Sequence, residues 1–279
     1  MHAELTRPDT EIPLHFVKEG VPLLMAPVKV NGQGPFDFII DTGNGAKALI
    51  ISQKLATQLG IQTKEKVVKT EFPVGFSKKF SIGKIDSFHI GKEALGVTEV
   101  AVAPALDELA DKLKANIDGN IGYGFLKNYA MTLDFKRSTL ELSHDSPKGD
   151  SVPFEIGGSK PLIVVEVIAD GKPLHFALDT GASYCCLSPQ AATELGLKLG
   201  AEHAVNGSAD HKSYLSKLKS LRVGGREQHD VGVAVADFLD DLTKAMGRQI
   251  DGVLGYTFWS KYRLTIDYRR KRLLLGDPQ

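Results

Sequence analysis

The chain contains little cysteine: two residues among 279, Cys185 and Cys186, which are adjacent. An ordinary disulfide needs a Cα separation that neighbouring residues of one chain do not reach, so a disulfide-stapled fold is excluded. Neither a Cys-x-x-Cys spacing nor a Cys/His family signature accompanies them. We therefore expect small buried or half-buried side chains in a strand rather than a reactive thiol or a redox pair.

The chain also lacks an excess of charge of one sign, because 34 Lys and Arg balance 34 Asp and Glu. This balance removes the usual electrostatic case for binding nucleic acid or an anionic membrane, and a neutral partner such as a polypeptide fits better. No apolar run approaches the length of a membrane span, and the N-terminal residues lack the apolar region of a secretory signal. The compartment stays open: the protein remains inside the cell, or it is a periplasmic or secreted protein whose signal has been removed.

One pattern occurs twice in the sequence. Residues 38–43 read Phe-Ile-Ile-Asp-Thr-Gly, and residues 176–181 read Phe-Ala-Leu-Asp-Thr-Gly. Each copy places one carboxylate, Asp41 or Asp179, after an apolar strand-like run and before a Gly that favours a turn. Two equivalent acids are therefore available to meet across a pseudo-twofold axis.

The repeat extends over almost the whole chain. Residues 117–123 (Ile-Asp-Gly-Asn-Ile-Gly-Tyr) match residues 250–256 (Ile-Asp-Gly-Val-Leu-Gly-Tyr). Only two copies of well over a hundred residues are present, which indicates a duplicated domain rather than a solenoid. The polar stretch 143–150 contains Pro and Gly and is typical of a linker. We predict an N-terminal lobe over residues 1–146 and a C-terminal lobe over residues 147–279.

Within each copy the pattern favours strands, with a few short helices. Ser52 and Ser188 are placed to cap short helices that end at Gly60 and Gly196. Apolar residues three and four apart predict a second helix in each copy, over residues 105–113 and 238–246.

Two further segments, residues 66–88 and 204–221, alternate in polarity and contain turn signals. Each is predicted to form a hairpin, and two interpretations stay open for each: a lid over the acids, or an ordinary surface hairpin. The candidate flap or substrate-binding residues are Val74, Gly75, Phe76, Gly207 and Tyr214.

The repeated triplets also suit a specific chemistry. Two carboxyls a hydrogen bond apart cannot both ionise cheaply, so Asp41 and Asp179 would share one proton and act as a base and an acid on one water. The rest of each triplet would support the dyad, because Gly lets the backbone approach closely and the Thr hydroxyl can bond to the main chain. These supporting residues are Thr42, Gly43, Thr180 and Gly181.

On these residues the chain resembles the pepsin and retropepsin superfamily of aspartic proteases. Both hallmarks occur twice: the Asp-Thr-Gly loop and a later apolar-apolar-Gly element, here residues 120–122 and 253–255. The short lobes are similar to two retropepsin-like domains fused in one chain. The resemblance implies a mainly β, bilobal acid-protease-like fold of two pseudo-twofold-related β-barrel lobes with a few short helices. It also implies a catalytic water, no metal and no organic cofactor, and a monomer, since both lobes lie in one chain.

The first copy departs from the family pattern at two places. Asn44 and Gly45 follow its triplet where the second copy has Ala182, and Asn120 stands where an apolar residue is expected. Asn44 either hydrogen-bonds the dyad or forms a turn with Gly45, and we favour the turn. Because Ala182 has no hydroxyl to stabilise a charged Asp179, we expect a pH optimum less acidic than that of pepsin.

The sequence therefore predicts an aspartic endopeptidase. The alternative is a non-catalytic peptide-binding or scaffold protein on the same fold, which the irregular first lobe favours. A third possibility is a zymogen or one half of a larger assembly, in which the residues before Val21 or a partner fill the cleft. A metal site is not expected, because the histidines show no ligand spacing such as His-Glu-x-x-His.

Overall fold

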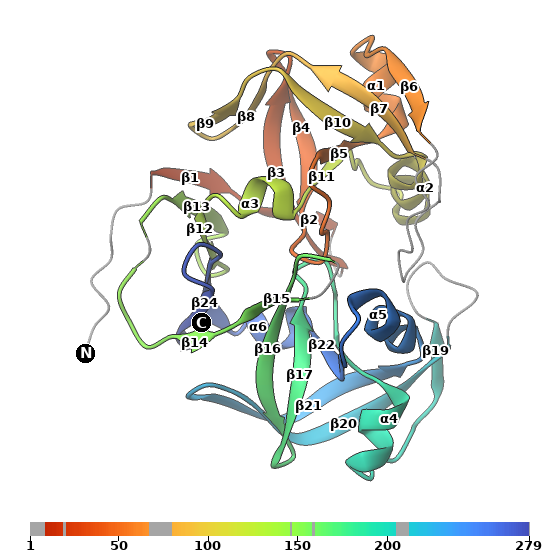
Figure 1. The fold of residues 1–279 in the computed structure, drawn as a ribbon, viewed down its shortest axis with the longest axis vertical. Coiled ribbons are helices and arrows are strands. Elements are labelled where there is room, and N and C mark those ends of the chain that lie inside the picture. Colours follow the sequence, from red (N-terminus) through yellow and green to blue (C-terminus); the bar gives the residue numbers. More distant parts are fainter. Residues whose placement is uncertain are drawn as a thin grey trace.

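The computed structural model describes residues 9–18, 21–66, 80–145, 147–157, 160–204 and 212–278. The strands form three sheets, one from each half of the chain and one shared between them (Figure 1). The predicted flap residues Val74, Gly75, Phe76 and Gly207 lie outside the described residues.

The first-half sheet contains ten strands. In spatial order these are β6 (Thr63–Lys66), β7 (Phe80–Ile85), β10 (Thr98–Val102), β5 (Leu49–Ile51), β11 (Gly119–Ile121), β4 (Gln33–Ile40), β3 (Val21–Val30), β8 (Phe88–Ile90) and β9 (Glu93–Leu95), with β2 (His15–Lys18) beside β3. β8 follows β7 after two residues and pairs with β3, which curls the sheet back on itself.

The second-half sheet repeats this plan with eight strands. Their spatial order is β15 (Glu155–Gly157), β16 (Leu162–Ala169), β17 (Lys172–Leu178), β22 (Gly252–Leu254), β18 (Cys185–Leu187), β21 (Arg226–Ala236), β20 (Lys212–Val223) and β19 (Glu202–Ala204). An additional pairing of β16 with β20 closes the sheet into a barrel. The interior is filled by fully buried side chains such as Phe176 and Leu218.

The third sheet joins the two halves. Its strands are β1 (Thr10–Pro13), β13 (Thr139–Ser143), β12 (Ala130–Asp134), β23 (Tyr262–Asp267), β24 (Arg272–Pro278) and β14 (Val152–Pro153). β12 and β23 pair at its centre, where the hydroxyls of Thr132 and Thr265 lie 2.7 Å apart. These two residues are equivalent in the repeat, so the pseudo-twofold axis passes between them. The predicted mainly β, two-lobed fold is confirmed.

The short helices form where the caps predicted them. α1 (Gln53–Gln58) and α4 (Pro189–Glu194) begin after Ser52 and Ser188, whose hydroxyls accept the backbone N–H three residues on. After each of these helices the backbone turns at a Gly, Gly60 or Gly196. Both have a positive φ, which Gly adopts more easily than other residues. α3 (Tyr123–Leu126) and α6 (Tyr256–Trp259) follow the apolar-apolar-Gly elements.

The longer helices, α2 (Pro104–Leu113) and α5 (Phe238–Met246), pack against the sheets beside the strands that carry the aspartates. Leu106 of α2 belongs to one apolar cluster with Ile39, and Leu239 of α5 belongs to another with Ala177. Complete burial of one such Leu contributes about 2 kcal/mol. In Figure 1 the two helices lie on the same side of the molecule, away from the shared sheet. None of the described helices has the length and apolar content that crossing a membrane requires.

The described residues before Val21 are built into the sheets. β1 pairs with β13, with Thr10 opposite Leu142, and β2 pairs with β3. These residues therefore add one strand, β1, to the edge of the shared sheet and one strand, β2, to the first-half sheet. The lobe boundary between residues 146 and 147 stays a prediction, and it falls between β13 and β14.

Candidate active site

The two Asp-Thr-Gly loops follow directly from strands β4 and β17. Each of these strands runs parallel to the strand of the apolar-apolar-Gly element, β11 or β22. The backbone N–H of Asp41 donates to the carbonyl of Ile121 at 3.0 Å, and that of Asp179 donates to the carbonyl of Leu254 at 3.2 Å. The two motifs that the sequence repeats are thus neighbours in space, and each fixes where its aspartate leaves the sheet.

Thr42 and Thr180 tie the two loops together. The backbone N–H of each donates to the Oγ1 of the other, both at 3.0 Å. Each hydroxyl in turn donates across the junction: Thr42 Oγ1 to the Leu178 carbonyl at 3.1 Å, and Thr180 Oγ1 to the Ile40 carbonyl at 2.8 Å. Both threonines are fully buried, so these four bonds are shielded from water.

The two carboxyl groups meet above this crossing, close enough for each to change the pKa of the other. The approach depends on the glycines. A Cβ at Gly43 would lie 2.5 Å from Cγ of Asp179, and one at Gly181 would lie 3.0 Å from Oδ1 of Asp41. Each lobe therefore presents a bare backbone to the aspartate of the other. The structure brings together all six predicted residues of the two triplets.

Burial disfavours the charged form of both aspartates. It raises the pKa of Asp179 to about 7, and the negative charge of Asp41 contributes to the same rise. Burial also raises the pKa of Asp41, but N–H donors from Asn120 and the backbones of Gly43 and Asn44 oppose the rise. Gly181 donates its N–H to Asp179 Oδ1 at 2.7 Å. The pair can hold one proton near neutral pH.

The irregular residues of the first lobe are partners of each other. Asn120 Nδ2 donates to Asp41 Oδ2 at 2.8 Å, and Asn44 Nδ2 donates to Asn120 Oδ1 at 2.7 Å. Our preference for Asn44 as merely a turn residue is incomplete: its Oδ1 accepts the Ala46 N–H, as in a turn, but its side chain is buried and reaches the dyad through Asn120. Sequence reasoning missed Asn120. The available signal was that both departures from the family pattern lie in one copy.

Aromatic side chains from both halves of the chain pack around the loops. Trp259 donates its Nε1–H to the Asp179 carbonyl at 3.2 Å, and Phe135 from the first half packs on its ring. Tyr268 from the second half packs on Tyr123, which follows the apolar-apolar-Gly element of the first lobe. The equivalent of Trp259 in the repeat is Leu126, so the donor to the loop carbonyl exists on one side only.

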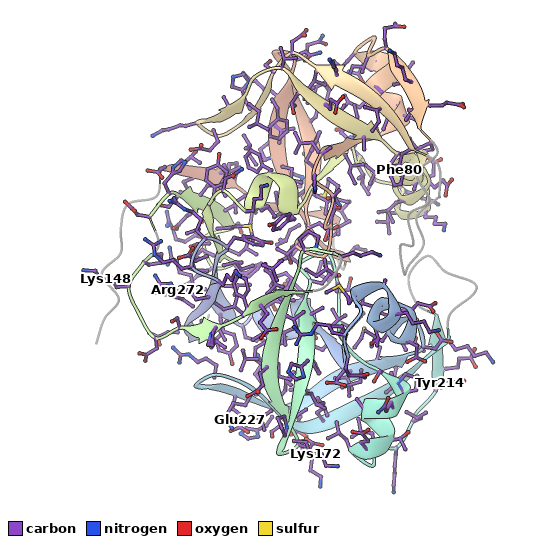
Figure 2. The ribbon with its side chains drawn as sticks, in the orientation of Figure 1. Phe80, Lys148, Lys172, Tyr214, Glu227 and Arg272 are labelled. Atoms are coloured by element: carbon purple, nitrogen blue, oxygen red, sulfur yellow. The ribbon has the colours of Figure 1, made fainter. Side chains whose placement is uncertain are left out.

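The remaining candidate residues lie elsewhere. Tyr214 is half-buried in β20, opposite Val235, and Figure 2 shows it at the right-hand edge of the second lobe. Its role as a flap residue stays a prediction. Cys185 is buried and Cys186 half-buried, both free, as expected for strand residues. Within the described part of the chain, no group of three His, Cys, Asp or Glu side chains could hold a metal ion.

Comparison with known proteins agrees with this geometry. The profile of the aspartyl protease family matches residues 26–125 and 165–258. These two regions cover more than half of the chain and contain one Asp-Thr-Gly loop each, so the chain belongs to the aspartyl protease family.

Among solved structures, the chain is similar to a retropepsin-like aspartic protease from Rickettsia conorii. The two are 20% identical over 46% of this chain and 88% of that one, with a TM-score of 0.34. The comparison with curated proteins returned no match.

Proposed function

We propose that the chain is an aspartic endopeptidase in which Asp41 and Asp179 activate one water to hydrolyse a peptide bond. The observation that carries the proposal is the pair of buried carboxyls that meet at the junction of the two lobes, beside Gly43 and Gly181. A buried pair of this kind keeps one proton over its working pH range, since two adjacent negative charges are costly. It therefore holds a base and an acid at the same time.

In this mechanism the ionised carboxylate takes a proton from the water as the water oxygen attacks the peptide carbonyl carbon. The protonated carboxyl donates its proton to the carbonyl oxygen, so the intermediate is a neutral gem-diol and the pair again holds one proton. The carboxyl that took the proton of the water then passes it to the peptide nitrogen and the C–N bond breaks, which releases the amine. One hydroxyl of the gem-diol gives its proton to the other carboxylate as the product becomes a carboxylic acid, so the pair returns to its starting state. Each proton that leaves one group arrives on another.

The loops are arranged to keep the two acids in register during these steps. The crossed bonds of Thr42 and Thr180 fix the loop backbones from below, and Gly43 and Gly181 leave room for the carboxyls to touch. Such preorganisation lowers the cost of reaching the reactive geometry. Because the pKa of Asp179 is raised to about 7, we expect an optimum less acidic than that of pepsin.

The substrate in this proposal is a polypeptide, the lobes are residues 1–146 and 147–279, and the working unit is a monomer. The alternative function is a non-catalytic peptide-binding or scaffold protein, which the irregular first lobe favours. Its irregular residues, Asn44 and Asn120, supply a hydrogen bond to Asp41 instead of disrupting the dyad, which supports the enzyme.

The test compares the wild type with Asp41→Asn and Asp179→Asn. A denatured protein or a diverse peptide library is incubated from about pH 3 to pH 8, and new peptide termini are read by mass spectrometry. We expect cleavage by the wild type and a loss of at least about 1,000-fold in both variants, with unchanged circular dichroism. Asp230→Asn is the matched control, because Asp230 lies at the surface, where its carboxylate pairs with Lys217, and has a positive φ that Asn tolerates. Binding without turnover by the wild type would favour the peptide-binding module.

A further inference from the structure

The orientation of the Asn44 and Asn120 amides is fixed by their hydrogen bonds. The backbone N–H of Ala46 can only donate, so the Asn44 atom 2.9 Å away is the oxygen Oδ1. The other end of Asn44 is then its NH2 group, which donates to Asn120 Oδ1. Asn120 consequently directs its own NH2 group at Asp41 Oδ2. The chain of donors ends on a carboxylate oxygen that must accept.

We call the hydrogen bonds that run from Asn44 through Asn120 to Asp41 the amide relay. The second lobe has no equivalent of it. In the repeat, Asn44 corresponds to Ala182 and Asn120 to Val253, and neither of these side chains has a donor. Val253 is buried in an apolar cluster that Ala182 packs against. Asp179 receives backbone N–H groups from Gly181 and Ala182, which match those that Asp41 receives from Gly43 and Asn44. The two aspartates thus differ by one side-chain donor.

We propose that Asn120, held by Asn44, is a positioning residue that places the negative charge of the dyad on Asp41 and its proton on Asp179. An N–H donor stabilises the carboxylate more than it stabilises the protonated carboxyl, because a hydrogen bond to an ionised acceptor is the stronger one. The inference rests on the proposed function for its catalytic meaning: Asp41 is the base that takes the proton of the water, and Asp179 is the acid that protonates the carbonyl oxygen.

Among the described residues, two other titratable groups face the dyad, Tyr268 and Cys186, and burial raises the pKa of both, so they stay neutral near pH 7. Tyr268, in the turn after β23, faces both carboxyls, and burial raises its pKa above the ordinary value. Tyr123 of α3 packs against Tyr268. Cys186 of β18 faces Asp179, and burial raises the pKa of its thiol to about 12. The asymmetry between the aspartates therefore comes from the amide relay and not from a neighbouring charge.

The test is a carboxyl titration by NMR of protein labelled with 13C at the Asp carboxyl carbons, with signals assigned from Asp41→Asn and Asp179→Asn. In the wild type we expect the first proton released with rising pH to leave Asp41 and the second to leave Asp179. In Asn120→Val, which copies the second lobe, the first step should move up by about one pH unit, because a hydrogen bond to a charged group is lost. A first step on Asp179, or unchanged steps in Asn120→Val, would overturn the proposal.

Two further variants separate the relay from a general effect of mutation. Asn44→Ala should shift the first step in the same direction by a smaller amount, because Asn120 loses the donor that orients it. If the first step does not shift in Asn44→Ala, Asn44 is not part of the relay. Val253→Asn offers Asp179 the mirror-image donor and should lower the second step. If Val253→Asn does not fold, the Asn120 and Asn44 variants decide.

The titration does not need turnover, so it tests the proton assignment separately from the proposed peptidase activity. Expected titration steps in a protein without peptidase activity would support the proton assignment and overturn the endopeptidase. If the protein cleaves peptides, the acidic limb of its kcat/KM profile should move by the same amount in Asn120→Val as the first NMR step does. Cleavage with an unmoved acidic limb would leave the endopeptidase intact and overturn the role of Asn120.

Discussion

Thr42 and Thr180 each donate a backbone N–H to the other's hydroxyl oxygen, at the same distance of 3.0 Å. They are equivalent residues of a duplicated domain, so this reciprocity is what a twofold axis between the lobes requires. Each hydroxyl then donates a hydrogen bond to a backbone carbonyl of the other lobe, Thr42 to Leu178 and Thr180 to Ile40. The floor of the candidate active site is therefore a closed set of bonds in which neither lobe is complete alone.

Thr180→Val should destabilise the protein without changing its shape. The substitution removes the hydroxyl that serves the Ile40 carbonyl and the Thr42 N–H. Leaving these buried groups unpaired costs about 1–3 kcal/mol in the free energy of unfolding. Thr180→Ser keeps the hydroxyl and is the control. Urea denaturation measures both, and a stability of Thr180→Val equal to that of the serine variant would contradict the role given to the crossing.

Gly43→Ala should separate the carboxyls. The added methyl would lie 2.5 Å from Cγ of Asp179, so the carboxyl or the loop must move. Misplacement of about 1 Å at a reacting group costs about 100-fold in rate, and we expect at least that loss in peptide cleavage. Gly232→Ala is the control, because nothing lies within 4 Å of the added atom. Equal cleavage rates for the two variants would show that the close approach is not needed.

Asp179 should make the protein less stable as the pH rises. The pKa of the folded-state carboxyl is about 7, mainly because it is buried, whereas an unfolded Asp ionises near about pH 4. Between these values the folded state binds a proton that the unfolded state releases, so the free energy of unfolding falls by up to about 4 kcal/mol. Asp179→Asn removes this loss.

The measurement is denaturation of wild type and Asp179→Asn from about pH 4 to pH 8. The stability of the variant relative to the wild type should grow across this range. Asp230→Asn, at a surface site, should differ from the wild type by a nearly constant amount over this range, because Lys217 lowers the pKa of Asp230 below its ordinary value. A flat difference for Asp179→Asn would mean that its carboxyl ionises at an ordinary pH.

Tyr268→Phe should stabilise the protein. The Tyr268 hydroxyl is buried, and within the described ranges no group is its hydrogen-bond partner. Removing an unsatisfied buried hydroxyl gains about 1 kcal/mol. Tyr129→Phe is the opposing control, because the Tyr129 hydroxyl donates to Glu93 Oε2 at 2.9 Å, and its loss should cost about 1 kcal/mol. Thermal unfolding compares the two, and a lower melting temperature for Tyr268→Phe would contradict the expectation.

The parts of the fold that the sequence predicted are those with local causes. The helix caps at Ser52 and Ser188 depend on residues within one turn, and the repeat of the Asp-Thr-Gly triplet is visible without any geometry. The twofold relation then follows from duplication, which is why the meeting of Asp41 and Asp179 could be expected.

The parts that the sequence did not predict depend on contacts between distant residues. Asn44 has an adequate local explanation as a turn residue, and its partner Asn120 is 76 positions away. The packing of Phe135 on Trp259 joins the turn after β12 to α6 of the other half. No spacing or periodicity encodes these choices, because each is decided by which side chains fill the space between the lobes.

Asn120 and its counterpart Val253 also show what a single chain permits. An assembly of two identical subunits has to place the same residue on both sides of its axis, so a donor to one aspartate would be a donor to both. A chain in which each half has its own sequence is free of that constraint. It can keep the matching shapes that close the junction and still give its two acids different neighbours.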